Sequence, residues 1–518
     1  MALIDYFDRG CLVNRDGIAF AMGGQEWRFG EAQALTCRVA NGLLARGLGR
    51  GRHGAVLAGN DPAAWICVLG MWRAGVVWVP LNPRSSAAES GDLLNGFDVE
   101  TLFFQSAFAP VARELAANCP GLVNLVCLDG ECDGAISLDA FLADVDATPP
   151  AFVSAPDDVI AIMPTGGTTG RPKGVMQTNR NLSLSVLNGV INSSYAVDER
   201  IVNLAAAPMT HSAGFLSISA TARGGKVVIL PKPDPMLLLD TIERERVTEL
   251  FLPPTVIYSL LETPGIEQRD FSSLRYLMYG AAPMSLEKLR RAIELFGPVL
   301  FQGYGQTEAP GSIAFLRPGD HFVDGVIAPD SRLSACGTPA ITNGISIQDE
   351  AGAHLPQGES GEICISGDIV MKGYYKQPDE TAETIVDGWL HTGDIGHIDE
   401  EGFLHITDRK KDMIITGGFN VYPSEVEQVI WSHPSVLDCA VVGVPDEKWG
   451  EAVKAVIELK PEAQLEPADI IHLCKQRLGS VKAPKSVDFV KTLPRSPVGK
   501  VLKKDIREMY WKDVQRKI

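Results

Sequence analysis

The segment TGGTTGRPKG, residues 165–174, is rich in groups that can bind polyphosphate. Its glycines let backbone N–H groups approach an anion closely, its threonines add hydroxyl donors, and Lys173 supplies a positive charge. The segment directly follows an apolar run, residues 159–163, that is typical of a strand. It is not a Walker A loop, because Pro172 precedes Lys173 and Gly174 follows it. Taken alone, the segment is compatible with a flexible turn, so its interpretation depends on the rest of the chain.

Further motifs follow in a fixed order along the chain. They are PMTHSAG (208–214), YGAAPMS (279–285), YGQTE (304–308), GEICISGDIVMKGYYKQPDET (361–381), GWLHTGDIG (388–396), DRKKDMIITGGFNVYPSEVE (408–427) and PRSPVGK (494–500). In their residues and their order these motifs resemble those of the acyl-CoA synthetase branch of the adenylate-forming superfamily. That superfamily also contains luciferases and peptide-synthetase adenylation domains. The resemblance spans most of the chain. It implies an AMP-forming acid–thiol ligase that activates a carboxylate with ATP as an acyl-adenylate and then transfers the acyl group to coenzyme A.

The first step of such a reaction needs cations, because a carboxylate must attack a phosphate of the same sign of charge. The resemblance implies that Lys500 bridges the carboxylate and the α-phosphate. It also implies that Glu308, next to Thr307, binds Mg²⁺, which typically shares its ligands between a carboxylate, water and ATP. His211 is implied to hydrogen-bond the acyl carboxylate or to gate the acyl tunnel. A structural histidine is the alternative.

The resemblance assigns a nucleotide site as well. Tyr304 is similar to the ring that packs on adenine, and residues 280–282 resemble the rim of that pocket. Asp394 can accept hydrogen bonds from both ribose hydroxyls, and Arg409 is similar to a second ribose contact. The nucleotide-binding residues predicted in this way are Thr165, Gly166, Gly167, Thr168, Thr169, Gly170, Lys173, Gly280, Ala281, Ala282, Gly303, Tyr304, Gly305, Thr307, Asp394, Ile406, Arg409 and Lys500.

The second step is predicted to use a rotated arrangement of the small domain, with Lys411 as the hinge. Gly417, Gly418 and Phe419 are predicted to border the pantetheine tunnel, since a side chain at Gly418 would obstruct the thiol. The predicted acyl-pocket residues are His211, Ala213, Phe215, Ser217, Met278, Ala282 and Gly305. The acid itself is expected to be a medium- or long-chain fatty acid or a bulky aryl or alicyclic acid.

The elements that position these residues can be predicted from hydrophobic patterns. Short apolar β-rich runs alternate with helix-like segments such as residues 31–48, which favours parallel sheets covered by helices. The runs are residues 56–58, 76–80, 159–163, 227–230, 250–252 and 276–279. Residues 1–408 are therefore predicted to be α/β and to contain several subdomains. The resemblance adds a distorted β-barrel to this region.

A smaller α+β domain is predicted after Asp408, where the charged stretch DRKKD separates a glycine- and turn-rich region from a new strand. Residues 409–412 are the predicted hinge and residues 413–518 the mobile C-terminal domain. Strand-like runs cover residues 413–415, 439–444 and 452–459, and Ser424 with Glu427 is interpreted as a capping box that opens a helix.

Composition limits the remaining function classes. The formal charge of -17 argues against a nucleic-acid partner, because such binding needs clustered Lys and Arg. The ten cysteines form no CxxC pair and are expected to be reduced and structural. Asp5 and Asp8 stand where a signal peptide carries basic residues, and the apolar stretch 66–81 is too short to span a bilayer, so a cytoplasmic protein is expected. Family members are often dimers, which makes a homodimer an open alternative.

Other functions share parts of this pattern. A ligase that loads a carrier protein, a peptide-synthetase adenylation domain and a luciferase-like oxygenase use the same motifs. The insertion usual in carrier-loading fatty-acyl ligases is not evident, and neither is an Asp for an amino-acid ammonium. A non-catalytic nucleotide-binding regulator has no need for Lys500, so Lys500, Glu308 and Gly418 together favour a working enzyme.

Overall fold

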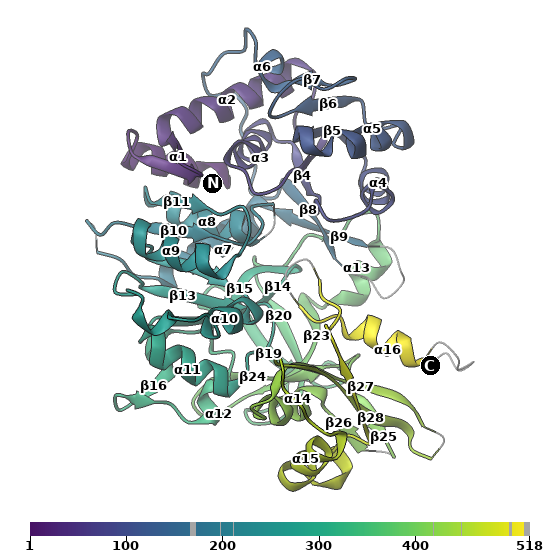
Figure 1. Ribbon diagram of the computed structural model, residues 1–518. Coiled ribbons are helices and arrows are strands. Elements are labelled where there is room, and N and C mark those ends of the chain that lie inside the picture. The colour runs from purple at the N-terminus through teal and green to yellow at the C-terminus, as the bar shows by residue number, and fades with distance from the viewer. Residues whose placement is uncertain are drawn as a thin grey trace.

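The computed structural model describes residues 1–165, 172–196, 198–210, 212–417, 419–446, 448–496 and 500–511. Two large sheets and an antiparallel half-barrel make up the N-terminal region, and a smaller α+β unit follows (Figure 1). This architecture confirms the predicted fold class: a large α/β region with barrel-like strands, and a small C-terminal α+β domain.

Two neighbouring strands of the first large sheet flank the predicted phosphate-binding segment. The central strands of this sheet run parallel, while β9 pairs antiparallel with β8 and β21 pairs antiparallel with β9. In sheet order the strands are β21 (Gly373–Tyr374), β9 (Lys173–Thr178), β8 (Val159–Thr165), β4 (Val77–Pro80), β3 (His53–Leu57), β5 (Val99–Phe104), β6 (Asn124–Cys127) and β7 (Ile136–Ser137). The predicted strands at 56–58, 76–80 and 159–163 are therefore confirmed.

The second large sheet contains the strands whose ends meet at the site. Strands β1, β10, β11, β12, β13 and β14 all run parallel, as the alternating pattern predicts. In sheet order the strands are β18 (Thr338–Pro339), β15 (Ala309–Leu316), β14 (Leu300–Gln306), β13 (Tyr276–Gly280), β12 (Glu249–Leu252), β10 (Val202–Ala205), β11 (Lys226–Ile229), β1 (Ile18–Met22) and β2 (Gln25–Arg28). In parallel sheets of this kind, ligands bind at the carboxyl ends of the strands.

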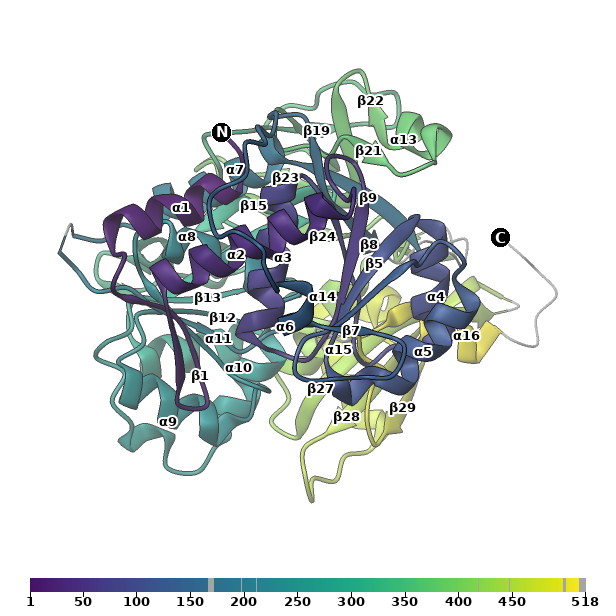
Figure 2. The same cartoon turned by 90° about the horizontal axis from the view of Figure 1, so that it is seen from above.

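Helices cover the two sheets. In Figure 2, α1, α2 and α3 lie side by side, and contacts between each pair agree with that view. The helices of this region are α1 (Ile4–Val13), α2 (Phe29–Ala45), α3 (Pro62–Ala74), α4 (Ala87–Gly96), α5 (Ala109–Asn118), α6 (Leu138–Phe141), α7 (Asn179–Asn192), α8 (Ser212–Thr221), α9 (Pro235–Glu245), α10 (Pro254–Leu261), α11 (Leu286–Phe296), α12 (Asp330–Leu333) and α13 (Pro378–Thr384). The predicted helix at 31–48 corresponds to α2.

The apolar stretch 66–81 forms most of α3 and all of β4. Asp61 caps α3 by accepting a hydrogen bond from the backbone N–H of Ala64 at 3.0 Å, and Gly75 ends the helix with φ of 77°. The charge that interrupts the stretch, Arg73, is buried and forms a two-pronged ion pair with Asp8, at 2.6 and 2.9 Å. This stretch is core. Within the described ranges, none of the helices has the length and apolar character that crossing a bilayer requires.

The antiparallel half-barrel connects the large sheets to the C-terminal unit. Its strands are β19 (Gly344–Gln348), β20 (Gly361–Ser366), β23 (Trp389–Ile398), β22 (Ile385–Val386) and β24 (Leu404–Arg409), with β24 paired to β23. That pairing sets Asp394 directly opposite Arg409. The ribose-site pair predicted from two separate motifs is thus a cross-strand pair. A small hairpin, β16 (Phe322–Val323) with β17 (Val326–Ile327), lies outside these sheets.

The C-terminal unit has its own sheet, packed against helices. Its elements are β25 (Ile414–Thr416), β26 (Phe419–Val421), α14 (Pro423–Trp431), β27 (Val436–Asp446), β28 (Gly450–Leu459), α15 (Pro467–Lys482), β29 (Ser486–Val490) and α16 (Lys503–Trp511). The strands predicted at 413–415, 439–444 and 452–459 are confirmed. The capping box is wrong: α14 begins after Tyr422 without a side-chain cap, and Ser424 and Glu427 make other contacts.

Candidate active site

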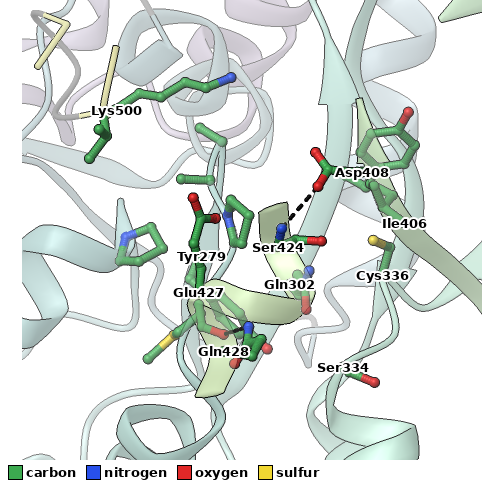
Figure 3. Close-up of a pocket in the computed structure, with 18 of the residues that line it drawn as sticks. Tyr279, Gln302, Ser334, Cys336, Ile406, Asp408, Ser424, Glu427, Gln428 and Lys500 are labelled. Carbon is green, nitrogen blue, oxygen red and sulfur yellow. Dashed lines mark hydrogen bonds between the residues drawn. The ribbon is translucent and has the colours of Figure 1, made fainter. Parts of the chain in front are cut away.

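A cavity of about 390 Å³ lies where the second sheet, the half-barrel and the C-terminal unit meet (Figure 3). Residues at the carboxyl ends of β13 and β14 line one wall, and residues of β23 and β24 line another. The predicted nucleotide-site residues that line the cavity are Gly280, Ala281, Ala282, Gly303, Tyr304, Gly305, Asp394, Ile406, Arg409 and Lys500. Four distant motifs and the C-terminal lysine therefore share one space.

Close backbone packing explains the small residues at the ends of β13 and β14. A Cβ atom on Gly280 would lie 2.4 Å from the backbone oxygen of Gly303, and one on Gly305 would lie 2.0 Å from that of Gly311. Ala281 follows β13 with φ of 64°, a left-handed conformation that a residue with a small side chain tolerates at modest cost. These positions bring main chain, rather than side chains, to the cavity wall.

Asp394 is the polar centre of the cavity. The hydroxyl of Tyr304 donates a hydrogen bond to Asp394 Oδ2 at 2.7 Å, and Arg409 Nε lies 3.1 Å from Asp394 Oδ1. Burial and the neighbouring Asp394 carboxylate raise the pKa of Tyr304 well above its usual range, so the phenol stays protonated and keeps donating. The arrangement holds a buried carboxylate in one orientation.

Lys500 enters this cavity from the C-terminal unit, and its extended side chain is visible in Figure 3. The loop that carries it is closed by two hydrogen bonds: Lys500 N–H donates to Ser496 Oγ at 3.1 Å, and Ser496 N–H donates to the Lys500 carbonyl at 2.7 Å. Burial, followed by repulsion from Arg409, lowers the pKa of Lys500 to about 8, although Asp394 opposes this shift. The ammonium group is thus poorly compensated until an anion arrives.

Four further polar residues of the cavity wall were missed by sequence reasoning. Glu427 on α14 is buried, accepts a hydrogen bond from the Val441 N–H at 2.7 Å, and pairs with Lys503 Nζ at 2.8 Å. Asp408 accepts a hydrogen bond from the Ser424 N–H at 2.9 Å, drawn in Figure 3. Burial raises the pKa values of Glu427 and Asp408, and both carboxylates attract Lys503. Asp408, Ser424 and Glu427 belong to one motif and Lys503 follows the last motif, but nothing in their spacing predicted that they meet.

The predicted phosphate-side residues form a second cluster. Thr165 and Lys173 are cross-strand partners on β8 and β9, so they hold the two ends of the connecting segment side by side. The ammonium of Lys173 lies 4.6 Å from the centre of the Tyr374 ring, and the Tyr374 hydroxyl donates a hydrogen bond to Glu308 Oε1 at 3.0 Å. Gln177 Nε2 donates a hydrogen bond to the carbonyl of Thr307 at 2.9 Å. Gly166, Gly167, Thr168, Thr169 and Gly170 lie outside the described residues.

The predicted acyl-pocket residues divide into two groups. Ala282 and Gly305 line the cavity, whereas Ala213, Phe215, Ser217 and Met278 are not among its described lining residues. Phe215 on α8 packs with the rings of Trp65, Trp72 and Trp78, at centroid distances of 5.6 to 6.5 Å. His211 lies outside the described residues. A role for the α8 residues and Met278 in acyl binding stays a prediction.

Two of the residues predicted for the CoA tunnel, Gly417 and Phe419, lie in the C-terminal unit away from the cavity lining. Gly417, in the turn between β25 and β26, has φ of 57°, and a Cβ atom there would lie 2.5 Å from the indole of Trp449. Phe419 and Trp449 are 60% and 42% exposed. Lys411 is exposed in the turn that follows β24. Gly418 lies outside the described residues. Gly417, Phe419 and Lys411 are not among the residues that line the cavity.

In the part of the chain that the structure describes, no group of three or more His, Cys, Asp or Glu side chains could hold a metal ion together. All ten cysteines are free thiols, nine of them buried, as expected from their scattered positions. A metal ion at this site would therefore rely on a substrate for most of its ligands.

Comparisons with known proteins extend over nearly the whole chain. The model of the family described as AMP-binding enzyme matches residues 7–375, and that of the AMP-binding enzyme C-terminal domain matches residues 425–500. The medium/long-chain fatty acid–CoA ligase FadD8 of Mycobacterium tuberculosis is 38% identical over 491 residues, covering 92% of this chain and 84% of that protein. A feruloyl-CoA synthase of Amycolatopsis is 36% identical, covering 94% and 95%. The structure of the amide bond synthetase McbA from Marinactinospora thermotolerans matches with a TM-score of 0.88 and 32% identity, covering 98% and 100%.

Proposed function

Because this chain belongs to the AMP-binding enzyme family, we propose that it is an AMP-forming carboxylate–CoA ligase. In the first half-reaction a carboxylate oxygen of the acid attacks the α-phosphorus of ATP, which gives an acyl-adenylate and releases pyrophosphate. In the second, the thiolate of CoA attacks the acyl carbon and AMP leaves. The observation that carries the proposal is the cavity in which Tyr304 and Asp394 of the N-terminal region meet Lys500 of the C-terminal unit.

In this proposal the Asp394 carboxylate binds the ribose hydroxyls. A carboxylate held by Tyr304 and Arg409 offers its remaining lone pairs to hydroxyl donors without having to reorient. The Tyr304 ring would pack on the adenine, and the main-chain wall at 280–282 would border it. The fixed orientation of Asp394 supports this role, because an oriented acceptor loses little entropy on binding.

Lys500 is the proposed catalytic residue of adenylate formation. Its ammonium would lie between the incoming carboxylate and the α-phosphate and stabilise the charge of the transition state. The lowered pKa of Lys500 supports this role, because a partly desolvated cation gains most when two anions approach it. Arg409, 3.1 Å from Asp394, supplies a second positive charge to the same cavity.

The phosphate chain would lie toward Lys173, Thr165 and the predicted loop 166–170, with Mg²⁺ at Glu308 and Thr307. Glu308 fits such an ion: Oε1 is held by Tyr374, while Oε2 makes no hydrogen bond or ion pair to any described residue. Carboxylate oxygens are hard ligands of the kind Mg²⁺ prefers. When bound, Mg²⁺ would neutralise charge on the phosphate oxygens.

For the second half-reaction we propose that the C-terminal domain, residues 413–518, rotates about residues 409–412 with Lys411 as the hinge. The structure holds Lys500 in the cavity, an arrangement that suits adenylate formation. Phe419 and Trp449 are exposed in this arrangement, and after the rotation these apolar side chains would pack against the N-terminal region. Gly417, Gly418 and Phe419 would then border the pantetheine tunnel.

The proposed acid is a medium- or long-chain fatty acid or a bulky aryl or alicyclic acid. The relatives named above support both classes, since one is a fatty acid–CoA ligase and another a feruloyl-CoA synthase. His211, Ala213, Phe215, Ser217, Met278, Ala282 and Gly305 remain the proposed acyl-pocket residues. A homodimer and a cytoplasmic location stay predictions from the sequence.

The proposal is tested by measuring AMP release from Mg·ATP with a panel of fatty, hydroxycinnamic and arylacetic acids, with and without CoA, and by identifying thioesters by mass. CoA-dependent thioester formation with one class of acid supports the ligase and identifies its substrate. Pyrophosphate exchange without a thioester would instead indicate another acceptor, such as a carrier protein or an amine. Absence of exchange with every acid would favour a non-catalytic nucleotide-binding protein.

Separate assays of the half-reactions test the roles proposed for Lys500 and Gly418. Lys500→Ala should lose adenylate formation but still convert supplied acyl-adenylate and CoA to thioester. Gly418→Leu should do the reverse. Equal loss of both half-reactions in either variant would refute this division of roles.

A further inference from the structure

Tyr374 lies between the two groups proposed to serve the phosphate chain. Its hydroxyl donates a hydrogen bond to Glu308 Oε1 at 3.0 Å, and its ring faces the Lys173 ammonium, 4.6 Å from the ring centre. Tyr374 is only 6% exposed, so water does not compete strongly for either contact. A single side chain thus touches the proposed metal carboxylate and the proposed phosphate cation.

The backbone around Tyr374 joins the same two elements. The N–H of Met371 donates to the carbonyl of Glu308 at 2.8 Å, and the N–H of Tyr375 donates to the carbonyl of Gly174 at 2.7 Å. Strand β21 pairs with β9, which sets Tyr374 opposite Val175. The segment therefore fixes the main chain of Glu308 relative to the strand that carries Lys173, and the Tyr374 hydroxyl fixes the Glu308 side chain as well.

The hydrogen bond between Tyr374 and Glu308 has a fixed donor and a fixed acceptor. The Tyr374 phenol donates its hydroxyl proton, and the Glu308 carboxylate can only accept it. A donor on Oε1 limits rotation of the carboxylate and leaves Oε2 available. Hydrogen-bond partners of metal ligands commonly orient the ligand in this manner, and their loss weakens metal binding.

We propose that Tyr374 is a positioning residue that orients Glu308 for a divalent cation and places Lys173 beside the same phosphate chain. This inference rests on the proposed function, because it takes Glu308 as a ligand of the cation that accompanies ATP. Tyr374 itself touches neither the metal ion nor the nucleotide in this proposal.

The neighbouring residue provides a matched control. Tyr375 also donates its hydroxyl to a carboxylate, Asp98 Oδ2, at 2.7 Å, and its ring also lies near a lysine ammonium, that of Lys376, at 5.3 Å. The two tyrosines therefore make the same kinds of contact on adjacent positions of the chain. Only Tyr374 makes them to residues of the proposed phosphate site.

The experiment is a titration of Mn²⁺ onto the full-length protein with a non-hydrolysable ATP analogue, followed by the electron paramagnetic resonance of free Mn²⁺. Wild type, Tyr374→Phe, Tyr375→Phe and Glu308→Gln are compared, and thermal unfolding verifies that each variant is folded. Tyr374→Phe should weaken Mn²⁺ binding about tenfold, Tyr375→Phe less than twofold, and Glu308→Gln most of all. The rate of pyrophosphate exchange in Tyr374→Phe should approach that of wild type when Mg²⁺ is saturating, because the ligand is displaced and not removed.

The outcomes separate this inference from the proposed function. If wild type binds Mn²⁺ with the analogue and Tyr374→Phe binds it equally well, the positioning role is refuted while the ligase proposal stands. If Tyr374→Phe and Tyr375→Phe weaken binding to the same extent, the effect is a general loss of stability and the inference fails. If Glu308→Gln binds Mn²⁺ as wild type does, the metal role of Glu308 in the proposed function is wrong.

Discussion

Raising the pH from 7 to 9 should lower kcat/KM for adenylate formation about tenfold, because Lys500 loses its charge over this range. The structure lowers the pKa of Lys500 from 10.5 to about 8, through burial and then through repulsion from Arg409. Since the protonated ammonium is the proposed catalytic form, about 91% of the free enzyme is competent at pH 7 and about 9% at pH 9. A lysine with the ordinary pKa would stay more than about 95% protonated at both values.

Bound substrates should shift this profile in a known direction. The kcat/KM profile reports the free enzyme, whereas the kcat profile reports the complex. ATP brings negative phosphates next to Lys500, which favours the ammonium form and raises its pKa. The fall in kcat should therefore begin at a higher pH than the fall in kcat/KM.

The assay is ATP–pyrophosphate exchange at fixed Mg²⁺ and ionic strength, with Lys500→Arg as the control. A guanidinium stays charged above pH 12, so this variant should be slower but should show no tenfold fall between pH 7 and pH 9. Two results would refute the reasoning. One is a wild-type kcat/KM that stays constant to pH 9.5, and the other is an equal fall in Lys500→Arg, which would assign the titration to a different group.

Two further predictions concern the walls of the cavity. Tyr304→Phe removes the hydroxyl that donates to the buried Asp394 carboxylate at 2.7 Å, a hydrogen bond worth roughly 1.5–3 kcal/mol. The affinity for ATP, measured by calorimetry, should therefore fall at least tenfold. Unchanged affinity would mean that Asp394 keeps its orientation without Tyr304. Gly280→Ala places a Cβ atom 2.4 Å from the Gly303 carbonyl oxygen and should lower the free energy of unfolding by about 1–3 kcal/mol or more in urea titrations. The control Gly96→Ala, at a position with open space around the new Cβ, should leave stability the same or slightly higher, and similar losses in both variants would contradict the packing argument.

Local patterns in the sequence were sufficient for the strands and the helix predicted from them, and the motifs identified ten of the residues that line the cavity. Each predicted strand and the predicted helix at 31–48 were confirmed, because apolar runs of strand length and amphipathic repeats depend only on neighbours in the chain. Asp394 and Arg409 were identified from separate motifs, and the pairing of β23 with β24 sets them opposite each other. The motifs thus contain the chemistry of the site.

Tertiary structure decided which residues share an environment. The S-x-x-E pattern at Ser424 predicted a local cap, but Glu427 instead pairs with Lys503, 76 positions further along the chain. Burying a carboxylate costs several kcal/mol unless a cation meets it, and that cation comes from α16, which no local pattern can reveal. Tyr374 reaches Glu308 across 66 positions for the same reason, and the low pKa of Lys500 arises from burial beside Arg409. The sequence by itself determined which chemical groups are present, whereas the contacts between distant segments determined their orientation, charge and partners.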